Sequence, residues 1–249
     1  MKAMIFAAGL GTRLRPLTDN KPKALVEIAG QPMLEHVVRR LIAAGFDEIV
    51  VNIHHFGQQI IDFLEANNNF GIQIHISDER DELLDTGGGI RKAKKWLSGN
   101  EPFLIHNADI LTDLDLKAFY DSHPKDADAT LLTANRTTSR YLICDATNRL
   151  RGWTNKITGE IRPKGFKPDP NCHHEVAYGC IEVVSPSIFK TLDAFSTEKK
   201  FSIFDFYLAN CNRLNIKCNM AEHYNWFDIG TPEKLIAAEN WFLHQSAAK

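Results

Sequence analysis

The sequence carries almost no net charge, no paired cysteine motif and no long apolar run. A formal net charge of -2 over 249 residues gives none of the basic field that binding to a phosphate backbone requires, so nucleic acid is not an expected partner. The five cysteines include no C-x-x-C pair, and their odd number argues against a complete disulfide framework. No apolar run approaches the ~20 residues that span a bilayer, and the start shows no signal-peptide pattern. We therefore expect a cytoplasmic protein that acts without a membrane.

The sequence has the composition of a globular domain, and strand-like and helix-like patterns alternate along it. Hydrophobic residues make up 44% of the chain and charged residues 24%, which is enough apolar material for one large core. Through the first half, short apolar runs alternate with helical patterns, which indicates a mainly parallel sheet covered by helices. The predicted strands are residues 3–8, 48–53, 72–76 and 102–109, and the predicted helices are 33–45, 57–68 and 89–97.

The sequence pattern changes from about residue 127 onward, because strand-like runs then follow one another directly. These runs lie at 128–134, 140–145 and 175–185, and helical patterns return at 202–211 and 231–245. This order predicts an added, smaller and mostly antiparallel portion. No internal repeat or linker is found, so we expect a single domain over residues 1–249. The predicted class is α/β, with a Rossmann-like, mixed and mainly parallel sheet flanked by helices.

A glycine-bearing loop, GLGTRLRPLTDNKPKAL, follows the first predicted strand directly. Glycines after a strand let backbone N–H groups approach phosphate closely. The loop fits neither common phosphate motif, because Leu14 stands where the dinucleotide fingerprint needs its third glycine and no Gly-Lys-Ser/Thr follows. Pro16 and Pro22 favour an extended, wrapping loop rather than a helix start. Arg13 and Lys23 suit phosphate oxygens, although a solvated surface loop explains the composition equally well.

The pattern of fixed positions in this loop resembles a family signature. The signature reads G-x-G-T-R-[LM]-x-P-x-T, followed by P-K, and belongs to the nucleotidyltransferases that activate sugar 1-phosphates. The matching positions are Gly9, Gly11, Thr12, Arg13, Leu14, Pro16, Thr18, Pro22 and Lys23. The resemblance extends over nearly the whole chain, and the short length is similar to that of the compact N-acetylmuramate and mannose 1-phosphate members. It implies the nucleotide-diphospho-sugar transferase fold.

The resemblance implies that the protein transfers a nucleoside monophosphate from an NTP to a sugar 1-phosphate and releases pyrophosphate. The implied partners are these two small molecules, bound by a monomer or a small homo-oligomer, and the implied cofactor is Mg²⁺. Arg13 would act on the departing pyrophosphate and Lys23 on the reacting phosphoryl group. The residues that the resemblance implies for nucleotide binding are Ala8, Gly9, Leu10, Gly11, Thr12, Arg13, Lys23, Glu79, Thr86, Gly87 and Gly88.

Two aspartates that lie far apart in the sequence are the implied metal ligands. Asp109 follows an apolar strand, and ligands in open α/β sheets gather at the carboxyl ends of strands. Asp228 belongs to WFDIGTP, which is similar to the family's W-x-D-x-G-T-P near the C-terminus. On composition alone, both could be ordinary turn residues. The resemblance makes Asp109 both catalytic and metal-binding, and it places Asn107 and Gly179 against the substrate.

One part of the sequence departs from the family pattern. Many members carry a Glu-Lys-Pro whose lysine holds the sugar phosphate, and this chain has none. Lys156 and Lys164 are the candidate substitutes. A phosphocholine cytidylyltransferase of the same fold therefore stays an alternative, as does a non-catalytic relative that senses nucleotides. A dinucleotide-dependent oxidoreductase is disfavoured by Leu14.

Overall fold

A computed structural model of the chain describes residues 1–247 and divides into two compact units. Within the described residues, unit 1 comprises residues 1–83, 105–118 and 224–247, and unit 2 comprises residues 84–104 and 119–223. Because the chain passes from one unit to the other several times, neither unit is a continuous stretch of sequence. The single domain predicted over residues 1–249 stays a prediction. None of the helices that the structure describes is long and apolar enough to cross a membrane.

Unit 1 contains the parallel strands that the sequence predicts for the first half. They are β1 (Lys2–Phe6), β4 (Glu48–Ile53), β5 (Gln73–Asp78) and β6 (Phe103–Asn107), with the first two residues of β6 assigned to unit 2. β1 lies between β6 and β4, and β5 follows β4. The β1–β4 and β4–β5 pairs are parallel. Strand β4 is buried at five of its six positions, as expected for a parallel strand with both faces covered.

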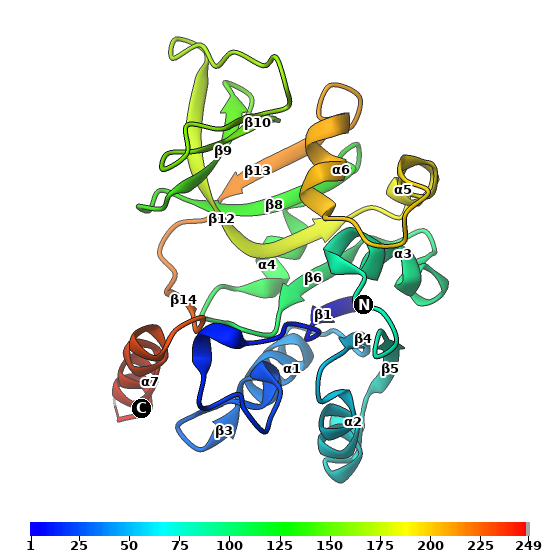
Figure 1. Cartoon of the computed structure of the whole chain (residues 1–249), viewed down its shortest axis with the longest axis vertical. Helices are drawn as coiled ribbons and strands as arrows, with labels where there is room; N and C mark the ends of the chain where they lie inside the picture. The colour runs from blue at the N-terminus through cyan, green and yellow to red at the C-terminus, as the bar shows by residue number, and fades with distance from the viewer. Residues whose placement is uncertain (248–249) are drawn as a thin grey trace. The chain divides into compact units, whose positions relative to one another are not determined.

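Three helices of unit 1 begin at, or one residue after, their predicted starts. They are α1 (Met33–Ala43), α2 (Gly57–Ala66) and α7 (Pro232–Ala247), shown in Figure 1. Gly45 adopts a left-handed backbone with φ 89° just after α1, which suits a glycine that ends a helix. α7 begins with a proline, whose missing N–H would have no partner in a first turn. The hairpin of β2 (Glu27–Ile28) and β3 (Gln31–Pro32) lies directly before α1 in the chain. A short helix, α4 (Leu116–Asp121), lies later in the chain.

Two short strands of unit 1 lie next to the residues that matter for the site. β7 (Ile110–Thr112) pairs antiparallel with β14 (Trp226–Asp228). The pair packs on a buried cluster made of Ile28, Met33, Leu111, Ile229 and Ala238. The rings of Phe227 and Trp241 pack against the same cluster, with centroids 5.2 Å apart. This packing fixes the chain on both sides of Asp228.

Unit 2 contains the antiparallel portion that the sequence predicts for the second half. Its strands are β8 (Ala129–Ala134), β9 (Arg140–Asp145), β10 (Leu150–Asn155), β11 (Ile161–Arg162), β12 (His173–Val184) and β13 (Ile216–Met220). β12 pairs antiparallel with β8 and β9, and β10 pairs antiparallel with β9 and β11. β13 pairs parallel with β8 instead. The predicted α/β class, with a mixed central sheet flanked by helices and a smaller antiparallel portion, is confirmed.

The helices of unit 2 differ from the prediction at two places. They are α3 (Asp85–Leu97), α5 (Ile188–Phe195) and α6 (Ile203–Asn210), and α3 contacts both of the others (Figure 1). α3 begins four residues before the predicted helix. α5 was not predicted, although its eight residues bury Ile188, Phe189 and Leu192 on one face, as an amphipathic helix does.

Candidate active site

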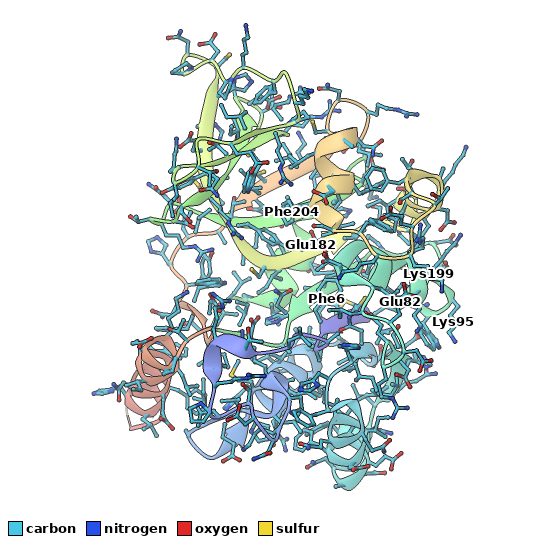
Figure 2. The ribbon with its side chains drawn as sticks, in the orientation of Figure 1. Phe6, Glu82, Lys95, Glu182, Lys199 and Phe204 are labelled. Carbon is cyan, nitrogen blue, oxygen red and sulfur yellow. The ribbon has the colours of Figure 1, made fainter. Side chains whose placement is uncertain are left out.

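The loop that follows β1 carries most of the predicted nucleotide-binding residues. β1 ends at Phe6, labelled in Figure 2, and residues 8–13 come almost directly after it. Gly11 adopts a left-handed backbone with φ 66°, which favours glycine. A Cβ atom at Gly11 would lie 3.1 Å from side-chain atoms of Thr18 and of Lys23. The Thr18 hydroxyl donates to the Gly11 carbonyl at 2.8 Å, so the loop folds back on itself as a wrapping loop.

Glu79, a predicted nucleotide contact, lies buried near the start of this loop. Its carboxylate accepts a hydrogen bond from the side-chain amide of Asn52 at 2.9 Å. The side-chain oxygen of Asn52 in turn accepts the N–H of Ala7 at 2.7 Å. Glu79 and Asn52 are almost fully buried, where polar groups need partners. The structure therefore connects Glu79 to the loop through Asn52, and a direct contact between Glu79 and a nucleotide stays a prediction.

Asp109 and Asp228 are brought together by the backbone of unit 1. Asp109 lies between β6 and β7, and Asp228 is the last residue of β14. In the β7–β14 pair, Asp228 stands opposite Ile110. The N–H of Ile229 also donates to the carbonyl oxygen of Asp109 at 3.0 Å. The two aspartates, which come from distant parts of the sequence, thus lie on neighbouring segments.

Each of these aspartates is paired with a lysine. The Lys23 ammonium contacts the Asp109 carboxylate, and Nζ of Lys234 lies 2.9 Å from Oδ2 of Asp228. Burial by itself would raise the pKa of Asp228. The hydrogen bond and charge of Lys234, together with the charges of Lys23 and Arg13, hold that pKa below its ordinary value. The structure therefore places the two acidic residues and the two predicted cations of the loop at one site.

Gly230 allows Arg13 and Asp228 to approach each other. A Cβ atom at Gly230 would lie 2.8 Å from Oδ1 of Asp228 and 3.1 Å from Nη2 of Arg13. These distances are shorter than ordinary carbon contacts, so a side chain there would displace the carboxylate or the guanidinium. The glycine of the WFDIGTP stretch is thus required by the geometry of the charged groups around it.

The oxygen donors of this site suit Mg²⁺ that arrives with another ligand. Within the residues that the structure describes, no group of three or more His, Cys, Asp and Glu side chains is arranged to hold a metal ion. The pair Asp109 and Asp228 has side chains that are 25% and 23% exposed. Mg²⁺ is commonly bound through one or two carboxylates, with water and phosphate oxygens completing its octahedron. The two aspartates fit that arrangement, and they do not form a cage made of protein alone.

Asn107, a predicted substrate contact, ends β6 and is half-buried. Its carbonyl oxygen lies 2.8 Å from Nδ1 of the neighbouring His106. Burial, with a smaller contribution from the charge of Arg40, lowers the pKa of His106 to about 4, and this hydrogen bond opposes the shift. His106 is therefore neutral at pH 7 and adds no positive charge next to Asp109. A contact between the Asn107 side chain and substrate stays a prediction.

Unit 2 contains Thr86, Gly87 and Gly88, which the resemblance places against the nucleotide. α3 begins at Asp85, so the glycines lie inside the first turns of the helix, whereas the sequence pattern places them before it. The N–H groups of Gly87 and Gly88 donate to the Phe201 carbonyl oxygen at 2.9 and 3.2 Å. The group that approaches these glycines closely is thus a backbone carbonyl of the protein itself. Nucleotide binding by the three residues stays a prediction.

The acceptor side of the predicted site also belongs to unit 2. A Cβ atom at Gly179 would lie 2.7 Å from Cδ2 of Leu132, so the missing side chain makes room for core packing. Nζ of Lys156 forms an exposed ion pair with Glu175 at 2.6 Å, and Lys164 is exposed. Sugar contact by Gly179 and phosphate contact by either lysine stay predictions.

Two residues of the site carry sequence signals that the motif comparison missed. Asn52 interrupts the apolar run EIVVNI, and a polar residue inside a buried parallel strand needs a specific partner. Lys234 lies in the first turn of α7, where the helix macrodipole disfavours a positive charge. Both residues are thus unusual for their local structure. The structure explains them, because the side chain of Asn52 accepts the N–H of Ala7 and the ammonium of Lys234 pairs with Asp228.

Comparisons with known proteins find a family and several relatives for this chain. Residues 2–151 match the family described as Nucleotidyl transferase. The chain is 34% identical to the N-acetylmuramate alpha-1-phosphate uridylyltransferase of Caulobacter vibrioides, over 95% of each chain. It is 32% identical to the protein of the same name from Neisseria meningitidis serogroup B, over 96% of this chain and 97% of the other. The fold is similar to that of a UDP-glucose pyrophosphorylase complexed with UDP-glucose, with a TM-score of 0.76, 20% identity and 98% of each chain covered.

Proposed function

This chain belongs to the nucleotidyl transferase family and is a sugar-1-phosphate nucleotidyltransferase, and on that premise we propose that it is a magnesium-dependent uridylyltransferase acting on N-acetylmuramate 1-phosphate. The base and the acceptor are supported by the two relatives of that name, which match nearly the full length of this chain. The observation that carries the proposed mechanism is the meeting of Asp109 and Asp228 beside Arg13 and Lys23.

The proposed reaction joins two anions, so the protein has to hold them together against their repulsion. An oxygen of the acceptor's 1-phosphate attacks the α-phosphorus of UTP. A new P–O bond forms there while the bond from the α-phosphorus to the bridging oxygen breaks, and pyrophosphate leaves with that electron pair. No side chain becomes covalently attached in this scheme. Positioning and charge neutralisation therefore account for catalysis.

The loop after β1 supplies positive charge at two places. Lys23 has a side chain that is only 12% exposed and contacts Asp109, so its ammonium is held beside a proposed metal ligand, from where it would act on the transferred phosphoryl group. Arg13 lies on the Asp228 side, and its planar fork suits the oxygens of the departing pyrophosphate. Asp109 and Asp228 would hold Mg²⁺, which supplies further charge neutralisation when bound.

A matrix of nucleotides against acceptors tests the proposal. The four ribonucleoside triphosphates are combined with N-acetylmuramate 1-phosphate, mannose 1-phosphate, glucose 1-phosphate and phosphocholine. Pyrophosphate release and mass spectrometry of the nucleotide product measure each pair. We expect the highest kcat/KM for UTP with N-acetylmuramate 1-phosphate. Turnover should stop when EDTA removes the divalent metal and return when Mg²⁺ is added.

Each other outcome of the matrix has its own meaning. A preference for GTP with mannose 1-phosphate, or for CTP with phosphocholine, would replace the proposed acceptor and leave the mechanism intact. Failure to release pyrophosphate with any pair would contradict catalysis and favour a relative that senses nucleotides. Undiminished turnover in EDTA would contradict the metal role of Asp109 and Asp228.

A further inference from the structure

Lys234 occupies a position that its own helix disfavours. It lies in the first turn of α7, which begins at Pro232, and the positive end of the helix macrodipole repels a lysine there. Its Nζ nevertheless lies 2.9 Å from Oδ2 of Asp228. The Lys234 side chain is 52% exposed and that of Asp228 is 23% exposed. The flexible aliphatic part of this half-exposed lysine therefore brings its ammonium from the surface to the carboxylate.

Positive charges outnumber negative charges among the charged groups of this site. The two carboxylates of Asp109 and Asp228 are accompanied by the three cations Lys23, Lys234 and Arg13. A free divalent cation that enters this group is attracted by the carboxylates and repelled by the cations. A triphosphate brings several negative charges and reverses that balance. The site as built favours a metal that arrives together with a triphosphate.

The two lysines differ in how firmly they are held. The side chain of Lys23 is 12% exposed, and its Cβ lies 3.1 Å from where a Cβ atom of Gly11 would stand. Lys23 is thus part of the packing of the loop. Lys234 has more than half of its side chain in solvent, so it can rotate away from Asp228 and expose the carboxylate.

We propose that Lys234 is a positioning residue that occupies Asp228 in the free protein and keeps free divalent metal out of the site until a triphosphate is bound. Once the triphosphate supplies negative charge, the Lys234 ammonium leaves Oδ2 of Asp228 and that oxygen becomes available to the metal. The identity of the metal as Mg²⁺ rests on the proposed function. The competition between Lys234 and a divalent cation for Asp228 needs no turnover.

Binding of Mn²⁺ to the full chain, followed by electron paramagnetic resonance and calorimetry, tests this competition. Lys234→Met keeps most of the stem and removes the charge, and Lys234→Arg keeps the charge. We expect Lys234→Met to bind Mn²⁺ roughly fivefold to tenfold more tightly than the native protein, which is the scale of removing one nearby cation. Lys234→Arg should bind Mn²⁺ like the native protein. With a non-hydrolysable UTP analogue bound, the advantage of Lys234→Met should largely disappear.

Two control variants separate this effect from a general change in charge. Lys94 forms an ion pair with Asp193 in unit 2, with side chains 43% and 41% exposed, so Lys94→Met removes the same charge from a comparable pair. It should leave Mn²⁺ binding unchanged. The double variant Lys234→Met with Asp228→Asn should not show the tighter Mn²⁺ binding, because the carboxylate that pairs with Lys234 is then absent.

Three results would overturn the proposal. The first is Mn²⁺ binding by Lys234→Met that equals or falls below that of the native protein without nucleotide. The second is an equal gain in Lys94→Met, and the third is a gain that survives in the double variant. Failure of the proposed function would look different, since the native protein would then release no pyrophosphate while the Mn²⁺ difference between variants remained.

Discussion

The two units hold their acidic side chains in opposite ways. In unit 1, Asp228 is partly exposed beside Lys234, and its pKa lies below the ordinary value because the surrounding cations outweigh the effect of burial. In unit 2, Glu182 of β12, labelled in Figure 2, is fully buried. Burial raises the pKa of Glu182 to about 8, and the hydroxyls of Tyr207 and Tyr178 offset only part of that effect. At neutral pH, Asp228 is therefore ionised and Glu182 is protonated.

This difference separates a carboxylate that can exchange partners from one that belongs to a core. An ionised group near solvent can release a lysine and accept a metal ion, because it stays charged throughout. A neutral carboxyl buried beside the side chains of Tyr178 and Tyr207 would first have to be charged in a medium of low dielectric. The surroundings of an acidic residue, rather than its type, decide which one serves the chemistry.

The largest expected effect comes from neutralising the carboxylates of unit 1. Asp109→Asn and Asp228→Asn keep the shape of each side chain and remove its charge. Each should lower kcat/KM at least ~100-fold, which is the scale of losing a major electrostatic stabiliser. Pyrophosphate release measures the effect, and circular dichroism checks that the variants fold. Asp193→Asn, which breaks the exposed pair with Lys94 in unit 2, is the matched control and should turn over at the native rate. Near-native rates in both unit 1 variants would remove the metal assignment.

The loop and the two aspartates could be predicted because each belongs to a short, contiguous pattern. GLGTR and WFDIGTP carry their spacing within a few residues, so a resemblance can be read without knowing the fold. Their convergence could not be read from periodicity. It depends on the β7–β14 pairing, in which Asp228 stands opposite Ile110, and each of these strands is only three residues long.

The parts that the sequence left open depend on partners that are remote in the chain. Glu79, the residue after β5, accepts a hydrogen bond from Asn52 of the neighbouring strand β4, and the N–H of Gly87 donates to the Phe201 carbonyl oxygen. Nothing within a few residues of Glu79 or Gly87 indicates either contact. A local pattern identifies glycine or glutamate as unusual, but only the tertiary structure shows whether the partner is a ligand or the protein's own backbone.

Two glycine substitutions sharpen the comparison between the units with an intermediate effect. Gly230→Ala in unit 1 meets only the flexible ends of Asp228 and Arg13, so we expect kcat to fall roughly tenfold through misplacement of charged groups, with little change in Tm. Gly88→Ala in unit 2 meets the backbone carbonyl oxygen of Lys199, so we expect it to destabilise the fold by about 1–3 kcal/mol. Calorimetry and turnover are measured on both variants. A Gly88→Ala variant that kept its Tm and lost nucleotide binding would instead place that glycine against the nucleotide.

The effect expected to be smallest at any one step of its measurement, a single pH unit, concerns the buried carboxyl of unit 2 alone. Because folding raises the pKa of Glu182 from 4.5 to about 8, the folded state keeps a proton that the unfolded chain releases, and this group lowers stability as the pH rises through that window. The limiting slope is about 1.4 kcal/mol per pH unit, or about 3 °C in Tm for a chain of this size. Glu182→Gln removes the titration and keeps the shape, so the variant should gain Tm relative to the native protein as the pH rises from 5 to 8. A Tm difference that stays constant over this range would mean that Glu182 is ionised when folded, and the contrast with Asp228 would be lost.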